Sequence, residues 1–346
     1  MILSAALSLK QVFPDSSFPD ISINSIASLD DSTDNDLVFV FKGNKPIQLD
    51  DISYKLCVLD SSLSVEIPAK CENVIVVPNA RLVLARLLQF IDKHFLITFR
   101  PEDYVVSSLA DIHPTATIED RVFIGPFCHI GENVVIKKGA ILKSGVHVNK
   151  NSVIGAKCYI DANTVIHSSV TLGNNVQIGS NTTIGSPGFG FERDASSWQH
   201  LAHVSGVSIG DNCFIGSNVA IDAGILKPTQ IDNDVIVDNL VQIAHHVKIG
   251  SFTAVAGCVG IAGSAEIGEN CLIGGGACIN GHIKITNGTV VTGMTMVTAH
   301  ISTPGVYSSG IPANSNSQWK KNAASFSHLA QLRKDISKIK KELLDR

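Results

Sequence analysis

At 346 residues the chain has room for two or three domains, and its net charge of −4 gives no general attraction for nucleic acid. It has neither a run of about 18 apolar residues that could span a bilayer nor an N-terminal stretch with the charged, apolar and small-residue sections of a signal peptide. These features predict a cytoplasmic protein without a transmembrane segment and without a nucleic-acid partner.

Residues 1–105 lack a regular repeat and are predicted to form a small N-terminal α/β domain. Strand-like apolar runs occur at Leu37–Phe41 and Val74–Val77. The domain is expected to end near Arg100-Pro101. A helix is predicted over Ala80–Lys93, because apolar residues recur there at helical spacing, at Leu82, Leu84, Leu87, Leu88 and Ile91.

From Ile112 to Ile184 an aliphatic residue occupies every sixth position, and four positions after each stands a small one, such as Ala116. A period of six fits neither an α-helix nor an antiparallel strand, and it is typical of a parallel β-helix built from hexapeptides. Three hexapeptides make one triangular coil, with both repeated positions pointing inward. The low aromatic content, 6%, suits such a narrow interior. We therefore predict a mainly β fold with a β-helix over residues 106–311.

The repeat is interrupted over residues 186–206, in a segment that contains Gly188-Phe189-Gly190-Phe191 and Trp198. A buried coil cannot absorb some twenty extra residues, so this segment is predicted to be an external loop, and such insertions often mark the functional face. A smaller bulge is predicted between Ile221 and Ile231, and the repeat then continues in step to Val297.

The chain contains eight cysteines without metal-type spacing. Four of them occupy the small inward position of a hexapeptide and are predicted to be buried free thiols, which favours a reducing compartment: Cys128, Cys158, Cys213 and Cys271. No metal site is expected.

Residues 312–346 are predicted to form a C-terminal amphipathic helical extension, because apolar residues from Phe326 to Leu343 recur three or four apart. Between Trp319 and Arg346 there are eight Lys or Arg residues against three acidic ones, a local net charge of +5. Such a helix could pack on itself or on symmetry mates, or it could dock an acidic partner. The sequence leaves both possibilities open.

Two histidines are singled out by the repeat. His245 follows the aliphatic position Ile243 by two residues, and His282 follows Ile279 by three, so both are expected on one edge of the prism, two coils apart. Two coils are separated by roughly 10 Å. Gly263, 18 residues after His245, is expected directly beside it. A histidine next to an accessible backbone N–H is the arrangement of a general base and an oxyanion donor.

Four motifs carry a resemblance to a known family: Val237–His245, Asn280–His282, Thr292–Met294 and Pro304–Gly310. With them, essentially the whole chain resembles the UDP-3-O-acylglucosamine N-acyltransferases of lipid A biosynthesis. The resemblance implies a left-handed β-helix, a uridine-binding N-terminal domain and a homotrimer with active sites between neighbouring β-helices. The implied reaction moves an (R)-3-hydroxyacyl chain from acyl carrier protein, where it is held on 4′-phosphopantetheine, to the 2-amino group of UDP-3-O-acyl-glucosamine, with no further cofactor.

The resemblance also implies roles for individual residues. His245 would be the general base, Gly263 would offer its N–H to the thioester oxyanion, and His282 would assist substrate binding and catalysis. Met294 and Met296 would line the far end of the acyl groove. The basic C-terminal helix would meet acyl carrier protein, which is acidic.

Asp238, Asn239 and Gln242 stand just before His245 and are expected to supply polar contacts to a hydroxylated substrate. The family pattern has Asn after the catalytic histidine, whereas this chain has His246. A second titratable ring at that position would influence the base.

The family stacks uracil between aromatic side chains in a Phe-x-x-Asn-x-x-Tyr-like segment. Here the segment Phe39–Lys45 keeps phenylalanines and an asparagine but lacks the tyrosine. Phe39, Phe41 and Asn44 are therefore the expected uridine contacts, and nucleotide affinity is expected to differ from the family norm.

Two alternatives from other classes are weighed. A γ-type carbonic anhydrase would hold zinc with two histidines about five residues apart, whereas His200 and His203 are three apart and His245 and His246 are adjacent. A non-catalytic β-helix scaffold would need neither the N-terminal domain nor the expected pairing with Gly263. Within the acyltransferases, the UDP-N-acetylglucosamine O-acyltransferase shares the coil but lacks an N-terminal domain of this size.

Overall fold

The computed structural model describes residues 2–14, 18, 20–27, 36–41, 56–63, 73–91 and 104–344. The chain divides into two compact units, Met1–Arg100 and Pro101–Arg346. Among the described residues, no helix combines the length and apolar character that crossing a membrane requires. Asn44, one of the expected uridine contacts, lies outside the described residues.

The N-terminal unit contains one five-stranded sheet in the order of the chain. Its first two strands are antiparallel and the others pair in parallel. The strands and helices are β1 (Ile2–Ser8), α1 (Leu9–Val12), β2 (Ser22–Ala27), β3 (Leu37–Val40), β4 (Leu56–Asp60), β5 (Val74–Val77) and α2 (Ala80–Ile91).

Helix α2 confirms the helix predicted over Ala80–Lys93, but with a narrower buried face than expected. Ala80, Leu87 and Ile91 are buried in the core of the sheet. Leu82 and Leu88 are exposed. The buried residues follow a spacing of seven and four, which is one stripe of an α-helix.

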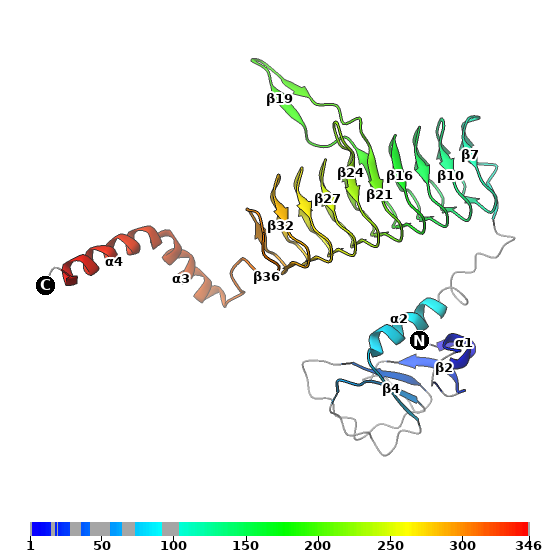
Figure 1. The fold of residues 1–346 in the computed structure, drawn as a ribbon, viewed down its shortest axis with the longest axis horizontal. Coiled ribbons are helices and arrows are strands. Elements are labelled where there is room, and N and C mark those ends of the chain that lie inside the picture. The colour runs from blue at the N-terminus through cyan, green and yellow to red at the C-terminus, as the bar shows by residue number, and fades with distance from the viewer. Residues whose placement is uncertain are drawn as a thin grey trace. The chain divides into compact units, whose positions relative to one another are not determined.

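The second unit is a parallel β-helix with three flat faces (Figure 1). Face 1 consists of β6 (Asp111–Ile112), β9 (His129–Ile130), β12 (His147–Val148), β15 (Val165–Ile166), β18 (Thr183–Ser186), β23 (Ala220–Asp222), β26 (Gln242–Ile243), β29 (Gly260–Ile261), β32 (Cys278–Ile279) and β35 (Met296–Val297). Face 2 consists of β7 (Thr117–Ile118), β10 (Val135–Ile136), β13 (Val153–Ile154), β16 (Val170–Leu172), β21 (Val207–Ile209), β24 (Thr229–Ile231), β27 (Lys248–Ile249), β30 (Glu266–Ile267) and β33 (Lys284–Ile285). Face 3 consists of β8 (Phe123–Ile124), β11 (Ile141–Leu142), β14 (Tyr159–Ile160), β17 (Gln177–Ile178), β22 (Phe214–Ile215), β25 (Ile236–Val237), β28 (Ala254–Val255), β31 (Leu272–Ile273), β34 (Val290–Val291) and β36 (Val306–Tyr307).

The chain runs repeatedly from face 1 to face 2 to face 3 and back to face 1. We name the three lines of turns between the faces edge 1–2, edge 2–3 and edge 3–1. Each edge stacks the turns of successive coils, so residues one coil apart on the same edge are neighbours. The predicted hexapeptide β-helix, which is left-handed, is confirmed.

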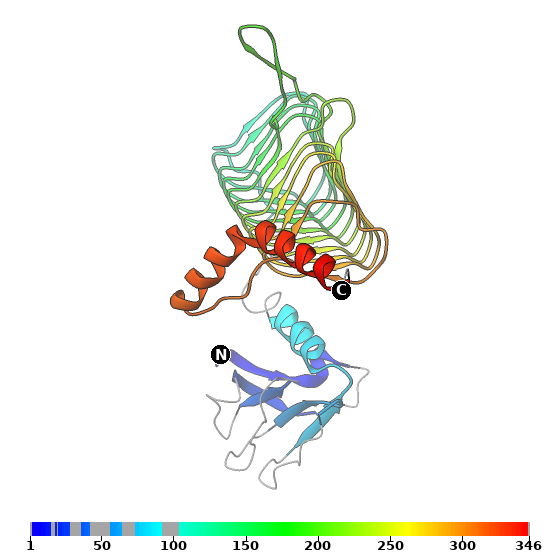
Figure 2. The same ribbon diagram turned by 90° about the vertical axis from the view of Figure 1, so that its left-hand side faces the viewer.

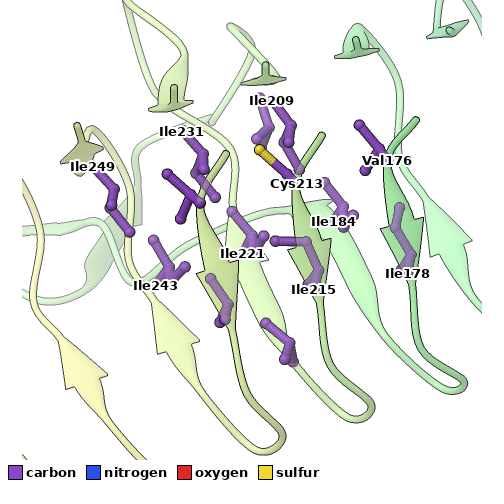
Figure 3. Packing of buried hydrophobic residues seen from close by; sticks show 14 of the residues in the cluster. Val176, Ile178, Ile184, Ile209, Cys213, Ile215, Ile221, Ile231, Ile243 and Ile249 are labelled. Carbon is purple, nitrogen blue, oxygen red and sulfur yellow. The ribbon is translucent and has the colours of Figure 1, made fainter. Parts of the chain in front are cut away.

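The interior explains why the hexapeptide repeat specifies this coil. The aliphatic position and the small position after it are buried from Val122 to Ile301, while Ile112, Ala116 and Ile118 at the start of the stack are partly buried. Figure 3 shows such side chains meeting in the interior. Two polar small residues show how the hydroxyl or thiol is satisfied by a carbonyl on the next coil: Ser152 Oγ donates to His167 O at 2.9 Å, and Cys158 Sγ donates to Gly173 O at 3.1 Å. The four cysteines predicted to be buried thiols are all free and buried. Pairing the hydroxyls and thiols limits the cost of burying polar groups in this core.

The excursions from the coil leave from edge 1–2. Residues 187–206 connect β18 on face 1 to β21 on face 2, and they contain the antiparallel hairpin β19 (Phe191–Arg193) and β20 (Trp198–His200). This segment confirms the predicted external loop, and the hairpin projects from one corner of the coil (Figure 2). The smaller bulge at residues 223–228 connects β23 to β24 across the same edge.

The C-terminal extension consists of two helices, α3 (Asn316–Ser327) and α4 (Leu329–Leu344). Ser315 caps the first by accepting from Gln318 N–H, and the helix ends at His328. Phe326, Leu329 and Leu343 are exposed on these helices, as are the other apolar residues of the predicted stripe. The extension is therefore helical as predicted, but with a break.

Candidate active site

His245 lies directly against Gly263 on edge 1–2. Strand register places Ile243 beside Ile261, so the two turns that follow stack on each other. A Cβ atom built on Gly263 would lie 2.8 Å from both Cε1 and Nε2 of His245. Only a glycine leaves the imidazole room to rest on the neighbouring backbone. The arrangement expected from the spacing of 18 residues is present.

The N–H of Gly263 is not used by the fold. No acceptor within the described part of the chain receives a hydrogen bond from it, whereas its carbonyl accepts from His282 N–H at 3.0 Å. A free backbone N–H next to a histidine can donate a hydrogen bond to a developing oxyanion.

His282 lies on the same edge, one coil beyond Gly263. Strand β32 pairs with β29 in the register Ile261 to Ile279. His282 occupies the turn position with a left-handed backbone, φ 59°, and its side chain is exposed. The structure therefore brings His245, Gly263 and His282 to one edge in consecutive coils.

His246 fills the space between His245 and the bulge at residues 223–228. Its Nε2 accepts from the N–H of Ile225 at 2.9 Å, and its Nδ1 lies 3.4 Å from Nδ1 of His245. Its own N–H donates to Thr229 Oγ1 at 2.9 Å. Burial lowers the pKa of the His246 ring, with a smaller contribution from the neighbouring His245, so the ring is held neutral.

His203 joins this cluster from the external loop, and the six-residue repeat could not have indicated it. Its ring centroid is 5.3 Å from that of His245, in an edge-on arrangement. Both of its ring nitrogens are buried without a hydrogen-bond partner in the described part of the structure. Gly188 and Gly190 pack against the ring, and a Cβ on either would come within about 3 Å of it. Burial lowers the pKa of His203.

Among the described residues, Asp222 is the buried carboxylate near the histidines, with 9% of its surface exposed. It accepts from Gln242 Nε2 at 3.2 Å and from Ser186 Oγ at 3.3 Å. Burial raises its pKa, while those two hydrogen bonds and the nearby rings of His203 and His245 oppose the rise. Sequence spacing gave no signal for Asp222, because the two excursions that flank it lie outside the repeat.

Gln242 and its expected companions are not in one place. Gln242 lies on face 1 beside edge 1–2, where its side chain is tied to Asp222. Asp238 and Asn239 follow β25 and therefore lie on edge 3–1, across face 1 from His245. Asn239 Oδ1 accepts from Ser217 N–H at 2.7 Å. These three residues were expected together because they are close in sequence. Within one chain, however, they lie at opposite sides of face 1.

The two methionines expected at the acyl groove are exposed on neighbouring parts of the coil. Met294 lies on edge 3–1, and its sulfur covers Gly276, where a Cβ would lie 2.6 Å from it. Met296 lies on face 1, paired with Cys278. A shallow pocket lined by Met294, Ser308 and Pro312 adjoins them.

In the N-terminal unit, Phe39 and Phe41 stack with ring centroids 6.2 Å apart and an interplanar angle of 13°. Phe39 is only 6% exposed and packs in the core. Phe41 is partly buried and has the guanidinium of Arg81 over its ring at 5.2 Å. Their role as uridine contacts stays a prediction, with Phe41 the more accessible of the two.

Comparisons with known proteins bear on both the fold and the family. A family model described as "GMPPB C-terminal domain" matches residues 101–186, and one described as "Hexapeptide repeat of succinyl-transferase" matches residues 206–239. A solved structure of UDP-N-acetylglucosamine acyltransferase from Arabidopsis covers 66% of this chain and 81% of its own, at 20% identity and a TM-score of 0.50. That likeness shows the fold.

The fold and the site define a hexapeptide-repeat β-helix protein with a histidine beside a free backbone N–H. UDP-3-O-acylglucosamine N-acyltransferase from Acinetobacter baylyi is 38% identical over 334 residues, covering 96% of this chain and 90% of that protein. The enzyme of the same name from Pseudomonas syringae is 35% identical, covering 78% and 75%. The chain belongs to the family of UDP-3-O-acylglucosamine N-acyltransferases, and it is an acyltransferase.

Within the described ranges, no group of three or more His, Cys, Asp or Glu side chains is arranged to hold a metal ion.

Proposed function

We propose that this chain transfers an (R)-3-hydroxyacyl group from acyl carrier protein to the 2-amino group of UDP-3-O-acyl-glucosamine in lipid A biosynthesis. The observation that carries the proposal is the contact of His245 with Gly263, whose N–H is free. The membership of the chain in the family supports the choice of substrate.

In the proposed reaction the neutral amine attacks the thioester carbonyl, and a C–N bond forms as His245 takes a proton from the amine. The carbonyl oxygen becomes an oxyanion and accepts a hydrogen bond from Gly263 N–H. The C–S bond then breaks, and the leaving thiolate of 4′-phosphopantetheine receives the proton from His245. The amide and a free thiol are the products, and no metal or further cofactor takes part.

We further propose that the active enzyme is a homotrimer with each site shared between neighbouring chains. The separation of Asp238 and Asn239 on edge 3–1 from His245 on edge 1–2 supports this proposal, since one chain alone does not bring them together. The outer surface of face 3 supports it too. Phe214 and Ile236 are exposed there on neighbouring strands, and Leu272 is exposed in the same register two strands further along, as in an interface between copies.

Helix α4 is the proposed docking surface for acyl carrier protein. Lys334, Lys338 and Lys341 stand on it, and acyl carrier protein is acidic. His282 is proposed to assist binding of the sugar at edge 1–2, and Met294 and Met296 to line the end of the acyl groove. We place the enzyme in the cytoplasm, a reducing compartment that suits the seven free cysteines among the described residues.

The test is the variant His245→Ala, assayed for acyl transfer from hydroxyacyl-loaded acyl carrier protein. Loss of the general base is expected to lower kcat by about 10²-fold or more, while light scattering reports an unchanged oligomer. His147→Ala, on the outer surface of face 1 far along the coil, is the matched histidine control and should turn over normally. Near-normal turnover by His245→Ala would reject this histidine as the base.

A further inference from the structure

In this coil, the backbone N–H two residues after an aliphatic position recurrently lacks a backbone hydrogen-bond acceptor. At the regular turns within the described residues, that N–H points away from the strand ladder and finds no backbone acceptor, whereas Ala223 beside the bulge donates to Ser186 O at 2.9 Å. At several turns a side chain one coil further along the chain accepts a hydrogen bond from this N–H. Asn174 Oδ1 accepts from Ala156 N–H at 3.0 Å, and Asn287 Oδ1 accepts from Glu269 N–H at 3.0 Å.

The same cap recurs at three other turns. The acceptors are Asp211 for Asn174 N–H at 2.6 Å, Asn233 for Asp211 N–H at 2.7 Å and Asn239 for Ser217 N–H at 2.7 Å. In every case the capping residue stands at the corresponding turn position of the next coil. An Asn or Asp at this position therefore accepts a hydrogen bond from the turn N–H of the preceding coil.

Gly263 holds this turn position, and the corresponding residue of the next coil is Gly281. Having no side chain, Gly281 cannot cap the Gly263 N–H. The two turns are nevertheless stacked as in the capped cases, because His282 N–H donates to Gly263 O at 3.0 Å. A Cβ on Gly281 would point over the Gly263 peptide, 2.9 Å from its oxygen and 3.8 Å from its nitrogen.

We infer that Gly281 is a positioning residue that keeps the Gly263 N–H available to the reacting carbonyl. The inference rests on the proposed function, because it assumes that this N–H receives the oxyanion. Gly281 acts through Gly263 and does not itself touch the reacting atoms. The φ of Gly281 does not require glycine, since it lies outside the left-handed region, and the capped turns carry Asn or Asp at this position; a Cβ here would shift the Gly263 peptide slightly.

The test compares Gly281→Asn with Gly281→Leu. Asparagine supplies the acceptor found at the capped turns, whereas leucine has nearly the same shape and the same Cβ but no acceptor. Loss of one oxyanion donor lowers kcat by about 10² to 10³-fold, so we expect that loss in Gly281→Asn. Gly281→Leu measures the effect of bulk alone, and we expect it to lose less than about ten-fold, as added bulk leaves the N–H unpaired.

Two further readouts separate capping from a general structural effect. KM for the UDP-sugar should be unchanged in Gly281→Asn. Its Tm should exceed that of Gly281→Leu, because both variants carry a Cβ close to Gly263 O and only asparagine adds a hydrogen bond to the coil. Asn287→Gly performs the reverse change on edge 2–3, where it uncaps Glu269 N–H. It should lower Tm and leave turnover unchanged.

Equal loss of kcat in Gly281→Asn and Gly281→Leu would overturn the inference, as would full activity in Gly281→Asn. Either result leaves the proposed function standing if His245→Ala is inactive. Full activity in His245→Ala would instead reject the proposed base, without deciding whether the introduced asparagine caps the N–H. The Tm of Gly281→Asn reports that cap independently of activity. A Tm below that of Gly281→Leu would overturn the inference.

Discussion

The contact between Gly263 and the imidazole of His245 makes a quantitative prediction for Gly263→Ala. The added Cβ would lie 2.8 Å from Cε1 and Nε2 of the ring. Non-bonded carbon atoms are most favourable at about 3.5 to 4.0 Å, so the ring must move by roughly 1 Å. A displacement of about that size at a reacting group costs on the order of 10²-fold in rate. We therefore expect kcat to fall about 100-fold.

Gly260→Ala is the matched control. Gly260 stands on the same coil, three residues earlier, and a Cβ built on it meets nothing within 4 Å. Neither glycine has the left-handed φ that would strain an alanine, so both variants should fold and keep Tm close to that of the parent. Single-turnover acyl transfer from loaded acyl carrier protein then compares the two substitutions directly.

A double-mutant cycle identifies the cause of the loss. If alanine acts by displacing the ring, Gly263→Ala should cost little in a chain that already carries His245→Ala, because the displaced group is absent. Turnover of Gly263→Ala within two-fold of Gly260→Ala would refute the steric argument. A full additional loss in the His245→Ala background would show that the alanine acts on the N–H instead of the ring.

Three more expectations follow from single contacts. Nε2 of His246 accepts from a backbone N–H, so the neutral ring carries its proton on Nδ1, which faces Nδ1 of His245. Histidine 15N spectra should show the Nδ1–H tautomer for His246, and a signal from its Nε2–H tautomer would contradict this. Exchanging Lys338 and Lys341 for Gln should raise KM for acyl carrier protein at low salt and reduce its salt dependence, whereas a constant KM would argue against docking on α4. Burial raises the pKa of Cys158 to about 11, so alkylation at pH 8 should spare this thiol until the protein unfolds. Because the raised pKa belongs to the folded state, the stability it contributes is complete below the ordinary thiol pKa and is lost as the pH rises toward 11; labelling in the native state would refute the burial.

The six-residue period predicted more of this structure than a list of strands. It fixed which positions point inward, so the burial of Cys158 followed from counting alone. It also fixed the neighbours across coils, so the contact of His245 with Gly263 could be stated before any coordinates. Both successes have one physical source: a parallel coil in register converts sequence separation into spatial separation by a constant rule.

The same rule explains what the sequence did not predict. His203 reaches the histidines through the excursion at residues 187–206, where the rule is suspended and the path depends on packing. Asp222 ends β23, which pairs with β26, but the bulge at residues 223–228 lengthens that coil beyond 18 residues, so counting did not place it beside His245. Asp238 and Asn239 were expected near His245 because they precede it closely, yet half a dozen residues are enough to carry the chain across a face of the prism. The break between α3 and α4 at His328 had no glycine or proline to signal it.

The proposed base and oxyanion donor lie on one edge, where the coil leaves groups that the fold does not use. Inward positions are apolar or hydrogen-bonded, and the backbone of each face is consumed by the strand ladder. The turns contain N–H groups that the strand ladder does not use. The turn N–H groups that an Asn or Asp of the next coil caps lie on edges 2–3 and 3–1. On edge 1–2 no such cap occurs within the described ranges, and both excursions leave from there. An N–H that the fold has not used, beside an excursion that can close over it, is what a transition state with a developing negative charge requires. The proposed active site thus lies where an uncapped N–H, a histidine and both excursions meet on one edge.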